Sequence, residues 1–378
     1  MQKIRTAIIG CGKVSDVHAE ALKNTPEAQF VAVYSRSPEK AKQYGEKYGV
    51  RGFCEIREMI AGAGVEAVIV CTPHPAHRDA AVMAAEAGAH VLVEKPLAST
   101  LQDCDEMLAA AKQAKVKIGI VCQRRFYSPV QRVRRAIDEG KIGKPALGTV
   151  LMLGWRDQKY YESDPWRGQW TAEGGGVLVN QAPHQLDLLQ WLMGPIDELF
   201  GVWSNFNHPY IEVEDSAVAV IRFRSGALGN IVVSNSQQPG LYGKVHVHGQ
   251  NGASVGVQTD GGAMFIAGMS SIQEPPINDL WTVPGEEALL ARWQQEDSDL
   301  FNGLDNAMGH YFQLQIGDFL RAIIDGREPL VSGEDGRRTV EIFTAIYRSQ
   351  RTHSPVKFPL KAEPSDLDYS AYTSVPLK

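Results

Sequence analysis

The chain has 378 residues, of which 44% are hydrophobic and 22% are charged, so it can build packed cores and is not a disordered acidic segment. At about 150 residues per domain, this length predicts two to three domains. The 38 Lys and Arg residues against 44 Asp and Glu residues give a formal net charge of -6, which argues against nucleic acid as a partner. No apolar run approaches the roughly 18 residues of a membrane span, and residues 1–11 lead into a strand-like segment instead of a signal peptide. We therefore expect a cytoplasmic protein with no membrane partner.

The cysteines all lie in the first third of the chain and form no CxxC pair. They are Cys11, Cys54, Cys71, Cys104 and Cys122. An odd and scattered set fits reduced thiols better than a disulfide framework or a zinc site. We expect most of them to be small core residues.

Short β-branched runs alternate with helical segments from the start of the chain to about residue 122. The runs cover residues 6–9, 30–34, 67–71, 90–94 and 117–121. Fully apolar strands that alternate with helices are typical of a parallel sheet covered on both faces. We therefore predict an α/β domain with a doubly wound parallel sheet over residues 1–123.

The pattern changes in the rest of the chain. A helix is predicted near residues 128–139, and residues 213–257 hold alternating runs that are typical of antiparallel strands with one solvated or partner-covered face. Helical periodicity returns in residues 311–325 and 335–351. We predict an α+β domain with a large, mostly antiparallel sheet over residues 124–378.

A glycine-rich turn follows the first predicted strand and opens a helix. It matches the G-x-G-x-x-G dinucleotide fingerprint, except that Ser15 takes the place of the third small residue. Gly10 permits the tight turn, and Gly12 lets the backbone approach a pyrophosphate, whose charge the helix N-terminus stabilises. The alternative is a glycine-rich turn without a ligand. We predict a nucleotide site that also includes Lys13 and Val14.

The end of the second predicted strand bears on the choice of cofactor. An NAD-binding unit usually places an acidic residue there, on the ribose hydroxyls, and this chain has Ser35 and Arg36 instead. A hydroxyl and a guanidinium can hold a 2′-phosphate, which favours NADP over NAD. The alternative is that Arg36 stacks on the adenine or is solvated.

Glu94, Lys95 and Pro96 stand at the end of the strand predicted at residues 90–94. Ligands of such sheets bind outside the carboxyl ends of the strands, so we expect Lys95 to point toward the nicotinamide end of the crevice. Pro96 restricts Lys95 and sets the exit of the strand. A surface lysine at a strand end is the alternative.

A second glycine-rich segment leads to another polar cluster. Asn180 is a suitable N-cap, and Gly194 a suitable stop, for a helix over roughly residues 181–193. Asn180, His184 and Asp187 then share one face of that helix. His184 could act as a general acid or base, and Asp187 could bind a substrate hydroxyl. The alternatives are a half-buried histidine and a solvated aspartate.

Other polar and aromatic residues are weaker candidates. Arg124 and Arg167 could supply hydrogen-bond donors, and Trp166 an aromatic wall. The aromatic segment at residues 155–170 could line a sugar pocket by stacking or be an ordinary packed loop. Histidines at positions 74, 77, 246, 248 and 310 have no spacing that demands a metal, and we predict no metal site.

These motifs, in this order, resemble the glucose-fructose oxidoreductase, inositol dehydrogenase and rhizopine-catabolism (Gfo/Idh/MocA) family over nearly the whole chain. The resemblance implies an N-terminal Rossmann domain that binds NAD or NADP, with Lys95 beside the nicotinamide and the reacting hydroxyl. It implies a site completed by an Asp-x-x-x-His-x-x-Asp segment, in which His184 is catalytic and Asp187 binds substrate. Asn180 stands where the family has the first Asp, which shifts acid and base duty toward His184 and Lys95.

The full set of predicted site residues is larger. Cofactor-binding residues are Gly10, Gly12, Lys13, Val14, Ser35, Arg36, Thr72, Pro73, His74, His77, Glu94, Lys95 and Gln123. Substrate-binding residues are Asp187, Asn180, Arg124, Trp166 and Arg167. Members commonly oxidise a secondary hydroxyl of a sugar, an inositol or a glycoside, or run the reverse reduction, and the cofactor carries the hydride without a metal.

Two other functions stay open. Some relatives use bound NAD during glycoside cleavage, but they carry a histidine-rich loop that this chain lacks. A non-catalytic nucleotide or sugar sensor shares the fold, and the presence of Lys95 and His184 argues against it.

The resemblance further implies self-association, because members usually pair the broad face of the second-domain sheet with another subunit. Alternating apolar positions in that sheet offer two faces, one for the core and one for an interface. They are Val218, Val220, Ile231 and Val233. We expect a homodimer or homotetramer.

Overall fold

The computed structural model describes residues 2–260 and 274–369. The chain forms two compact units, of which the first combines Met1–Gln123 with Asn306–Arg338. The second unit combines Arg124–Asp305 with Thr339–Lys378. The sequence had placed everything after residue 123 in the second domain, whereas the structure assigns residues 306–338 to the first.

The first unit is built on a six-stranded sheet in the order β3-β2-β1-β4-β5-β6. Every neighbouring pair is parallel. The strands are β1 (Ile4–Ile9), β2 (Ala28–Tyr34), β3 (Arg51–Phe53), β4 (Ala67–Val70), β5 (His90–Val93) and β6 (Ile118–Ile120). All five predicted runs are strands. Strand β3 was not predicted, because it is short and mostly exposed and contains no apolar run. The order is that of a doubly wound Rossmann sheet, so the predicted fold class is confirmed.

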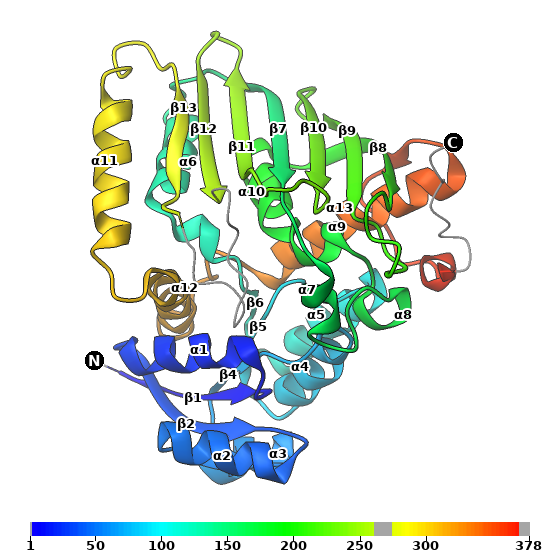
Figure 1. The fold of residues 1–378 in the computed structure, drawn as a ribbon. Coiled ribbons are helices and arrows are strands. Elements are labelled where there is room, and N and C mark those ends of the chain that lie inside the picture. Colours follow the sequence, from blue (N-terminus) through cyan, green and yellow to red (C-terminus); the bar gives the residue numbers. More distant parts are fainter. Residues whose placement is uncertain (1, 261–273, 370–378) are drawn as a thin grey trace. The chain divides into compact units, whose positions relative to one another are not determined.

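Helices cover this sheet, and in Figure 1 α1 lies above strands β1 and β2 while α2 and α3 lie below them. The helices are α1 (Lys13–Asn24), α2 (Pro38–Tyr48), α3 (Ile56–Ala63), α4 (His77–Glu86), α5 (Leu101–Ala114) and α12 (Ala307–Ile324), with the short 3-10 turn η1 (His74–Ala76). A second 3-10 turn, η2 (Gln123–Phe126), starts at the last residue of the segment Met1–Gln123 and continues into the second unit. Helix α12 packs on α1, and its Phe312, Ile316 and Phe319 are buried in one core with Ile8 and Leu22. This shared core is why residues 306–338 belong to the first unit.

The second unit is built on an eight-stranded sheet in the order β13-β12-β11-β7-β10-β9-β8-β14. The strands are β7 (Pro145–Leu153), β8 (Ile196–Ser204), β9 (Ser216–Phe223), β10 (Leu228–Ser234), β11 (Tyr242–Gly249), β12 (Ser254–Asp260), β13 (Ile277–Trp281) and β14 (Val356–Lys357). The pair β7 and β10 is parallel, and the other neighbouring pairs are antiparallel. The predicted mostly antiparallel sheet is therefore confirmed.

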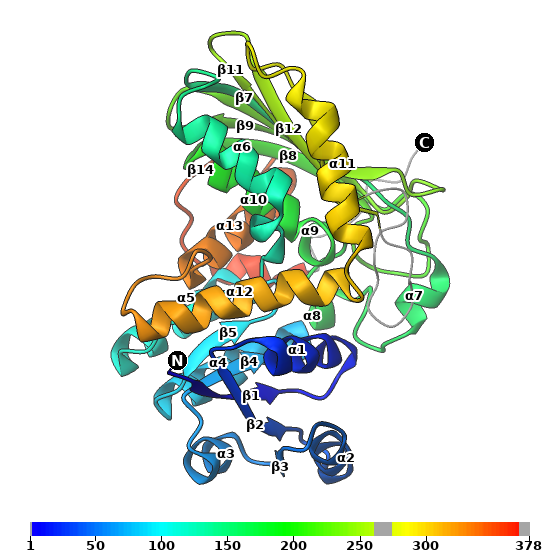
Figure 2. The ribbon, with the colours of Figure 1, turned by 90° about the vertical axis from the view of Figure 1, so that its left-hand side faces the viewer.

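One face of this sheet is covered by helices, as Figure 2 shows for α6 and α10. The helices of this unit are α6 (Ser128–Asp138), α7 (Gln158–Glu162), α8 (Trp170–Glu173), α9 (Val177–Asn180), α10 (Pro183–Met193), α11 (Leu289–Asn302) and most of α13 (Gly333–Thr352), followed by the 3-10 turn η3 (Pro364–Leu367). A glycine lets α10 approach β7 closely, because a Cβ at Gly148 would lie 2.6 Å from Met193. The core of the unit lies between this helical layer and the sheet.

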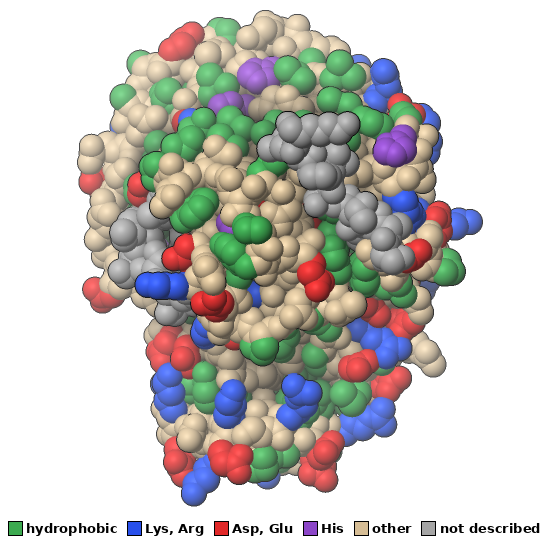
Figure 3. All heavy atoms as spheres, turned by 45° about the vertical axis from the view of Figure 1, so that its right-hand side comes forward, with side chains coloured by type: hydrophobic (Ala, Val, Ile, Leu, Met, Phe, Trp, Pro, Cys, Tyr) green, Lys and Arg blue, Asp and Glu red, His purple; other side chains and the backbone are tan. Residues whose placement is uncertain are grey.

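On the other face of the sheet, called the open face below, apolar side chains of the described residues are exposed. Val218 and Val220 of β9 are 46% and 59% exposed, whereas Ile231 and Val233 of β10 are buried. Hydrophobic side chains are visible on the surface of these strands in Figure 3. The structure thus assigns the two faces that the alternation left open, with Ile231 and Val233 in the core.

Two further expectations from the sequence concern the cysteines and membrane-spanning helices. Cys71, Cys104 and Cys122 are buried, Cys11 is partly buried and Cys54 is exposed, so most of the thiols are in or near the core as expected. Among the helices that the structure describes, none combines the length and apolarity needed to span a bilayer.

Candidate functional site

The predicted cofactor residues of the first unit gather at one edge of the parallel sheet. Gly10 follows β1, Ser35 follows β2 and Glu94 follows β5 directly, while Thr72 comes two residues after the end of β4. Gln123 lies shortly beyond β6. Because all strands are parallel, their carboxyl ends share this edge, which is where ligands of such sheets bind.

The glycine-rich turn has the geometry that a pyrophosphate needs. Gly10 has a φ of +107°, and a Cβ there would lie 2.9 Å from the main-chain carbonyl of Cys71, so a side chain is excluded. Gly12 is the N-cap of α1, without a side-chain cap bond and with open space around its Cα. The start of α1, at Lys13 and Val14, is therefore a place where a helix N-terminus can bind an anion. A dinucleotide fits the residues present.

The departure at Ser15 is accommodated inside α1. Its side chain is fully buried, and its hydroxyl donates a hydrogen bond to the Gly12 carbonyl. The serine therefore satisfies its polar group within the turn and leaves the helix start unchanged.

The end of β2 carries no acidic side chain. Ser35 is buried, and its hydroxyl oxygen accepts a hydrogen bond from the Ser37 N–H at 3.2 Å. Arg36 is exposed. Ser37 in turn caps α2 by accepting a hydrogen bond from the Lys40 N–H at 3.3 Å. The arrangement leaves one hydroxyl and one exposed guanidinium where a carboxylate would contact a ribose.

The segment around Lys95 is held from both sides. The half-buried Lys95 donates its main-chain N–H to Glu94 Oε2 at 3.0 Å. On the other side, His77 Nδ1 lies 2.9 Å from the Pro96 carbonyl, and His77 Nε2 lies 2.8 Å from the Thr72 carbonyl. Burial lowers the pKa of His77, so its ring is neutral and donates to one of these two carbonyls at a time. His77 thus ties the ends of β4 and β5 together.

Two predicted neighbours complete this edge. His74 begins η1 directly after Pro73, and its ring centroid lies 5.8 Å from that of His77. Both histidines are buried. The direct contacts of Pro73, His74 and His77 with a cofactor stay predictions.

In the second unit, Asn180 is not the cap of a helix over residues 181–193, and that prediction was wrong. Asn180 ends the single turn α9, where its N–H donates to the Gly176 carbonyl at 2.9 Å. Helix α10 starts later, at Pro183, with Ala182 as its N-cap. The side chain of Asn180 donates instead to the buried Glu173, and this strong acceptor is what draws the carboxamide away from the helix start.

His184 and Asp187 lie one turn apart on α10, and both are buried. Both carboxylate oxygens of Asp187 are bound by Arg125, at 2.8 Å and 2.6 Å, and the guanidinium also lies 5.0 Å from the centroid of the Trp191 ring. Asp187 therefore does not stand on a solvated helix face. Its contact with a substrate stays a prediction.

Arg124 is attached to the same region of the second unit. Its guanidinium donates to Thr259 Oγ1 at 3.1 Å, and the amide of Gln185, the neighbour of His184 on α10, donates to the same oxygen at 3.1 Å. The Thr259 hydroxyl itself donates a hydrogen bond to the Gly243 carbonyl at 3.2 Å. Thr259 was absent from the sequence prediction, since an isolated threonine in a strand carries no signal.

Trp166 and Arg167 form a stacked cluster with Tyr160. The Arg167 guanidinium lies 4.5 Å from the Trp166 ring centroid and 4.3 Å from that of Tyr160, and it donates to the Tyr160 hydroxyl. The amide of Gln181 donates to that hydroxyl at 2.8 Å. The aromatic segment is therefore packed against Gln181, which lies in the segment that leads into α10.

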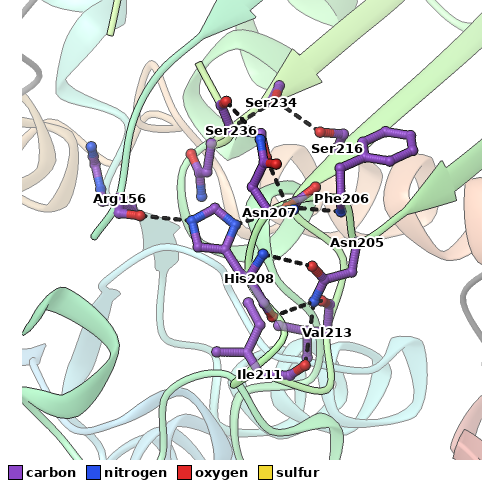
Figure 4. Close-up of polar contacts among 12 residues, drawn as sticks. Arg156, Asn205, Phe206, Asn207, His208, Ile211, Val213, Ser216, Ser234 and Ser236 are labelled. Atoms are coloured by element: carbon purple, nitrogen blue, oxygen red, sulfur yellow. Dashed lines mark hydrogen bonds and ion pairs between the residues drawn. The ribbon is translucent and has the colours of Figure 1, made fainter. Parts of the chain in front are cut away.

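A buried histidine supports the start of this aromatic segment. Figure 4 shows His208 with one ring nitrogen directed at the main-chain oxygen of Arg156, 2.7 Å away. The other nitrogen lies 2.8 Å from Asp215 Oδ2, which also accepts the Ser236 hydroxyl at 2.8 Å. Burial alone would raise the pKa of Asp215, but these hydrogen bonds hold it below its usual range. Sequence reasoning missed His208, because it belongs to no motif.

The residue before Asp215 anchors the glycine-rich approach to α10. The buried Glu214 accepts hydrogen bonds from the N–H groups of Gly176 and Leu178, at 2.9 Å and 3.0 Å, and from the Tyr347 hydroxyl at 3.0 Å. Burial raises the pKa of Glu214 to about 7 despite these donors. The carboxyl group therefore holds the segment that carries Asn180 and His184.

Both units are similar to known proteins. Residues 4–121 match the model of the oxidoreductase family with an NAD-binding Rossmann fold, and residues 130–255 match the GFO/IDH/MocA C-terminal domain. The chain is 28% identical over 362 residues to the myo-inositol 2-dehydrogenase of Thermotoga maritima, covering 94% of this chain and 98% of that protein.

Solved structures are similar over the same extent. The WlbA dehydrogenase from Bordetella pertussis, in complex with NADH and UDP-GlcNAcA, is 30% identical with a TM-score of 0.83, covering 95% of this chain and 99% of that chain. The aldose-aldose oxidoreductase from Caulobacter crescentus, complexed with glycerol, is 26% identical with a TM-score of 0.74, covering 94% and 100%. The fold, the glycine-rich turn and these similarities together show that the chain belongs to the Gfo/Idh/MocA family of oxidoreductases.

Proposed function

We propose that this protein is an NAD(P)-dependent dehydrogenase that oxidises one secondary hydroxyl of a sugar, polyol or glycoside, or reduces the corresponding ketone. The observation that carries the proposal is the edge of the parallel sheet, where the start of α1 at Gly12 and the segment of Lys95 follow strands of the same sheet. Similarity to the myo-inositol dehydrogenase, and to the WlbA dehydrogenase solved with NADH and a nucleotide-linked sugar, supports a hydroxylated ring as substrate.

Each group of residues has a proposed role. The turn from Gly10 to Val14 would hold the pyrophosphate, and Ser35 and Arg36 would hold the adenosine ribose. When bound, the nicotinamide accepts or donates the hydride. Lys95 and His184 are the proposed proton-transfer residues, since loss of a hydride from a carbinol requires that its hydroxyl proton be taken up.

The polar residues of the second unit have proposed roles in binding the sugar. They are Asn180, Asp187, Arg124, Trp166 and Arg167. Their ring contacts and hydrogen-bond donors suit a hydroxylated ring.

The proposed function is tested by following the absorbance of reduced nicotinamide. Purified protein is incubated with NAD or NADP and a panel of pyranoses, inositols, glycosides and nucleotide-linked sugars. Formation of reduced cofactor with at least one of them is expected. Binding of nucleotide without turnover on the whole panel, in either direction, would support a sensor instead.

Cofactor preference is predicted to depend on residue 35. Replacing Ser35 with Asp places a carboxylate against a 2′-phosphate and offers an acceptor to ribose hydroxyls, so the ratio of kcat/KM for NAD to that for NADP should rise by about tenfold or more. Paired titrations of both cofactors measure it. Ser37→Asp is the control, because it changes the charge of the same loop at the helix cap. A wild-type protein that already prefers NAD by a wide margin would contradict the NADP preference.

The open face of the eight-stranded sheet is predicted to pair with a second copy of the chain in a homodimer or homotetramer. Replacing Val220, which is 59% exposed, with Glu puts a charge in that apolar face and should lower the mass measured by light scattering. Leu300→Glu is the control, at a leucine of 43% exposure that lies on helix α11 and not on a strand of the sheet. A wild-type mass equal to one chain at micromolar concentration would contradict the prediction.

A further inference from the structure

We propose that His18 is a positioning residue for Lys95 and that it acts through the carboxylate of Glu94. The inference rests on the proposed function, in which Lys95 transfers a proton. It adds a residue of α1 to the machinery, outside the strand-end motif that contains Lys95.

The contact between His18 and Glu94 is short and buried. His18 has no exposed surface, and its Nε2 lies 2.7 Å from Glu94 Oε1. The other carboxylate oxygen accepts the main-chain N–H of Lys95 at 3.0 Å. The carboxylate of Glu94 therefore bridges the ring of His18 and the backbone of Lys95, with one oxygen for each.

The ring of His18 is itself held in place. It packs edge-on against Phe312 of α12, with ring centroids 4.8 Å apart and an angle of 87° between the planes. Helix α12 belongs to the first unit although it lies far from α1 in the sequence. The direction of the hydrogen bond to Glu94 is thus set by packing between α1 and α12.

The same helix that starts at the pyrophosphate turn therefore also supports Lys95. The N-cap Gly12 and His18 lie within two turns of each other on α1. A rigid helix that carries both contacts keeps the distance between the phosphate site and the strand end constant. This is a form of preorganisation, in which small displacements are costly for turnover.

The charge on Glu94 depends on His18. Burial by itself would raise the pKa of the Glu94 carboxyl, but the hydrogen bond and charge of His18, together with Lys95, hold it below its usual range. Among the described residues, two further titratable groups lie close to Glu94: Cys71, directly after β4, and His77, at the start of α4. Burial raises the pKa of Cys71 and lowers that of His77, so both are uncharged near neutral pH. Without His18, the pKa of Glu94 is expected to rise.

The test compares two substitutions at one position. His18→Gln keeps an N–H donor near the place of Nε2, while His18→Phe keeps an aromatic ring against Phe312 and removes the donor. On an identified substrate, His18→Phe is expected to lower kcat by about tenfold to 10²-fold with the cofactor KM changed less than about threefold. The acidic limb of its kcat profile should move to higher pH, and His18→Gln should recover most of the loss.

Three outcomes would overturn the inference. One is a His18→Phe enzyme with the kcat and pH profile of the wild type. Another is an equal loss in both variants, which would mean that the N–H donor kept in His18→Gln does not account for the effect. The third is a raised cofactor KM with kcat unchanged, which would place the effect at the phosphate turn. Thermal unfolding is measured for each variant, and His18→Leu takes the place of His18→Phe if the latter does not fold.

A second measurement needs no substrate, so that failure of the proposed function and failure of this inference are distinguishable. The rate at which Lys95 is acetylated is followed by peptide mass spectrometry, with Lys42, whose side chain is 77% exposed, as the internal reference. A released Lys95 beside a less charged Glu94 should react at least about threefold faster in His18→Phe and at the wild-type rate in His18→Gln. An unchanged rate in His18→Phe would overturn the inference, even if no sugar of the panel is turned over.

Discussion

Replacing Lys95 or His184 with alanine is expected to reduce turnover by roughly 10² or more while leaving cofactor binding largely intact. The reason is that oxidation of a carbinol needs a base within about 2.6 to 3.2 Å of its hydroxyl in the productive complex, and general acid and base contributions are of this size. Lys95 stands just beyond the end of β5, and His184 lies in the first turn of α10.

Steady-state kinetics and cofactor titration measure the two effects separately. Asn180→Ala is the matched control, because Asn180 cannot ionise and its carboxamide donates to Glu173. We expect this change to cost less activity than either of the other two. Near-normal turnover in both Lys95→Ala and His184→Ala would show that the assignment of the proton-transfer residues is wrong.

Breaking the buried ion pair of Arg125 and Asp187 is expected to have the largest effect on stability. Their side chains are 3% and 2% exposed, and both oxygens of Asp187 are engaged. Asp187→Ala leaves the Arg125 guanidinium buried without its counter-ion, which typically costs about 3–5 kcal/mol in the free energy of unfolding. Denaturant unfolding of the wild type and the variant measures the difference.

A surface pair in the same unit supplies the control. Arg134 and Asp138 form an ion pair along α6, in which the aspartate side chain is 61% exposed. Asp138→Ala should therefore cost less than about 1 kcal/mol. If Asp187→Ala costs no more than Asp138→Ala, the Arg125–Asp187 pair does not anchor α10. A raised substrate KM in Asp187→Asn at normal stability would instead support its predicted contact with substrate.

The local pattern predicted most of the first unit. The five runs form strands that can be buried on both faces because consecutive positions in them are apolar, and the parallel order follows from the helices between them. The same pattern predicts that Gly10, Gly12 and Lys95 lie at one edge of the sheet. These residues were predictable because their roles depend on the turn or strand end in which they lie.

The start of α10 shows where local reasoning failed. Asn180 is a good N-cap by residue type, but a buried acceptor seven residues earlier takes its side chain. A capping preference is worth about 1 kcal/mol, so a hydrogen bond to a buried carboxylate outweighs it. The helix therefore begins at Pro183.

The sequence by itself determined the doubly wound fold, the glycine-rich turn and the position of Lys95, since each depends on neighbours within one turn or strand. Only the tertiary structure decided that α12 belongs to the first unit, that His18 reaches Glu94 across 76 residues, and that Arg125 reaches Asp187 across 62. These contacts join buried polar groups from distant segments, and each group must find a partner because burial makes an unpaired charge costly. The packing of helices and strands determines which partner each group contacts, and a local sequence pattern does not contain that information.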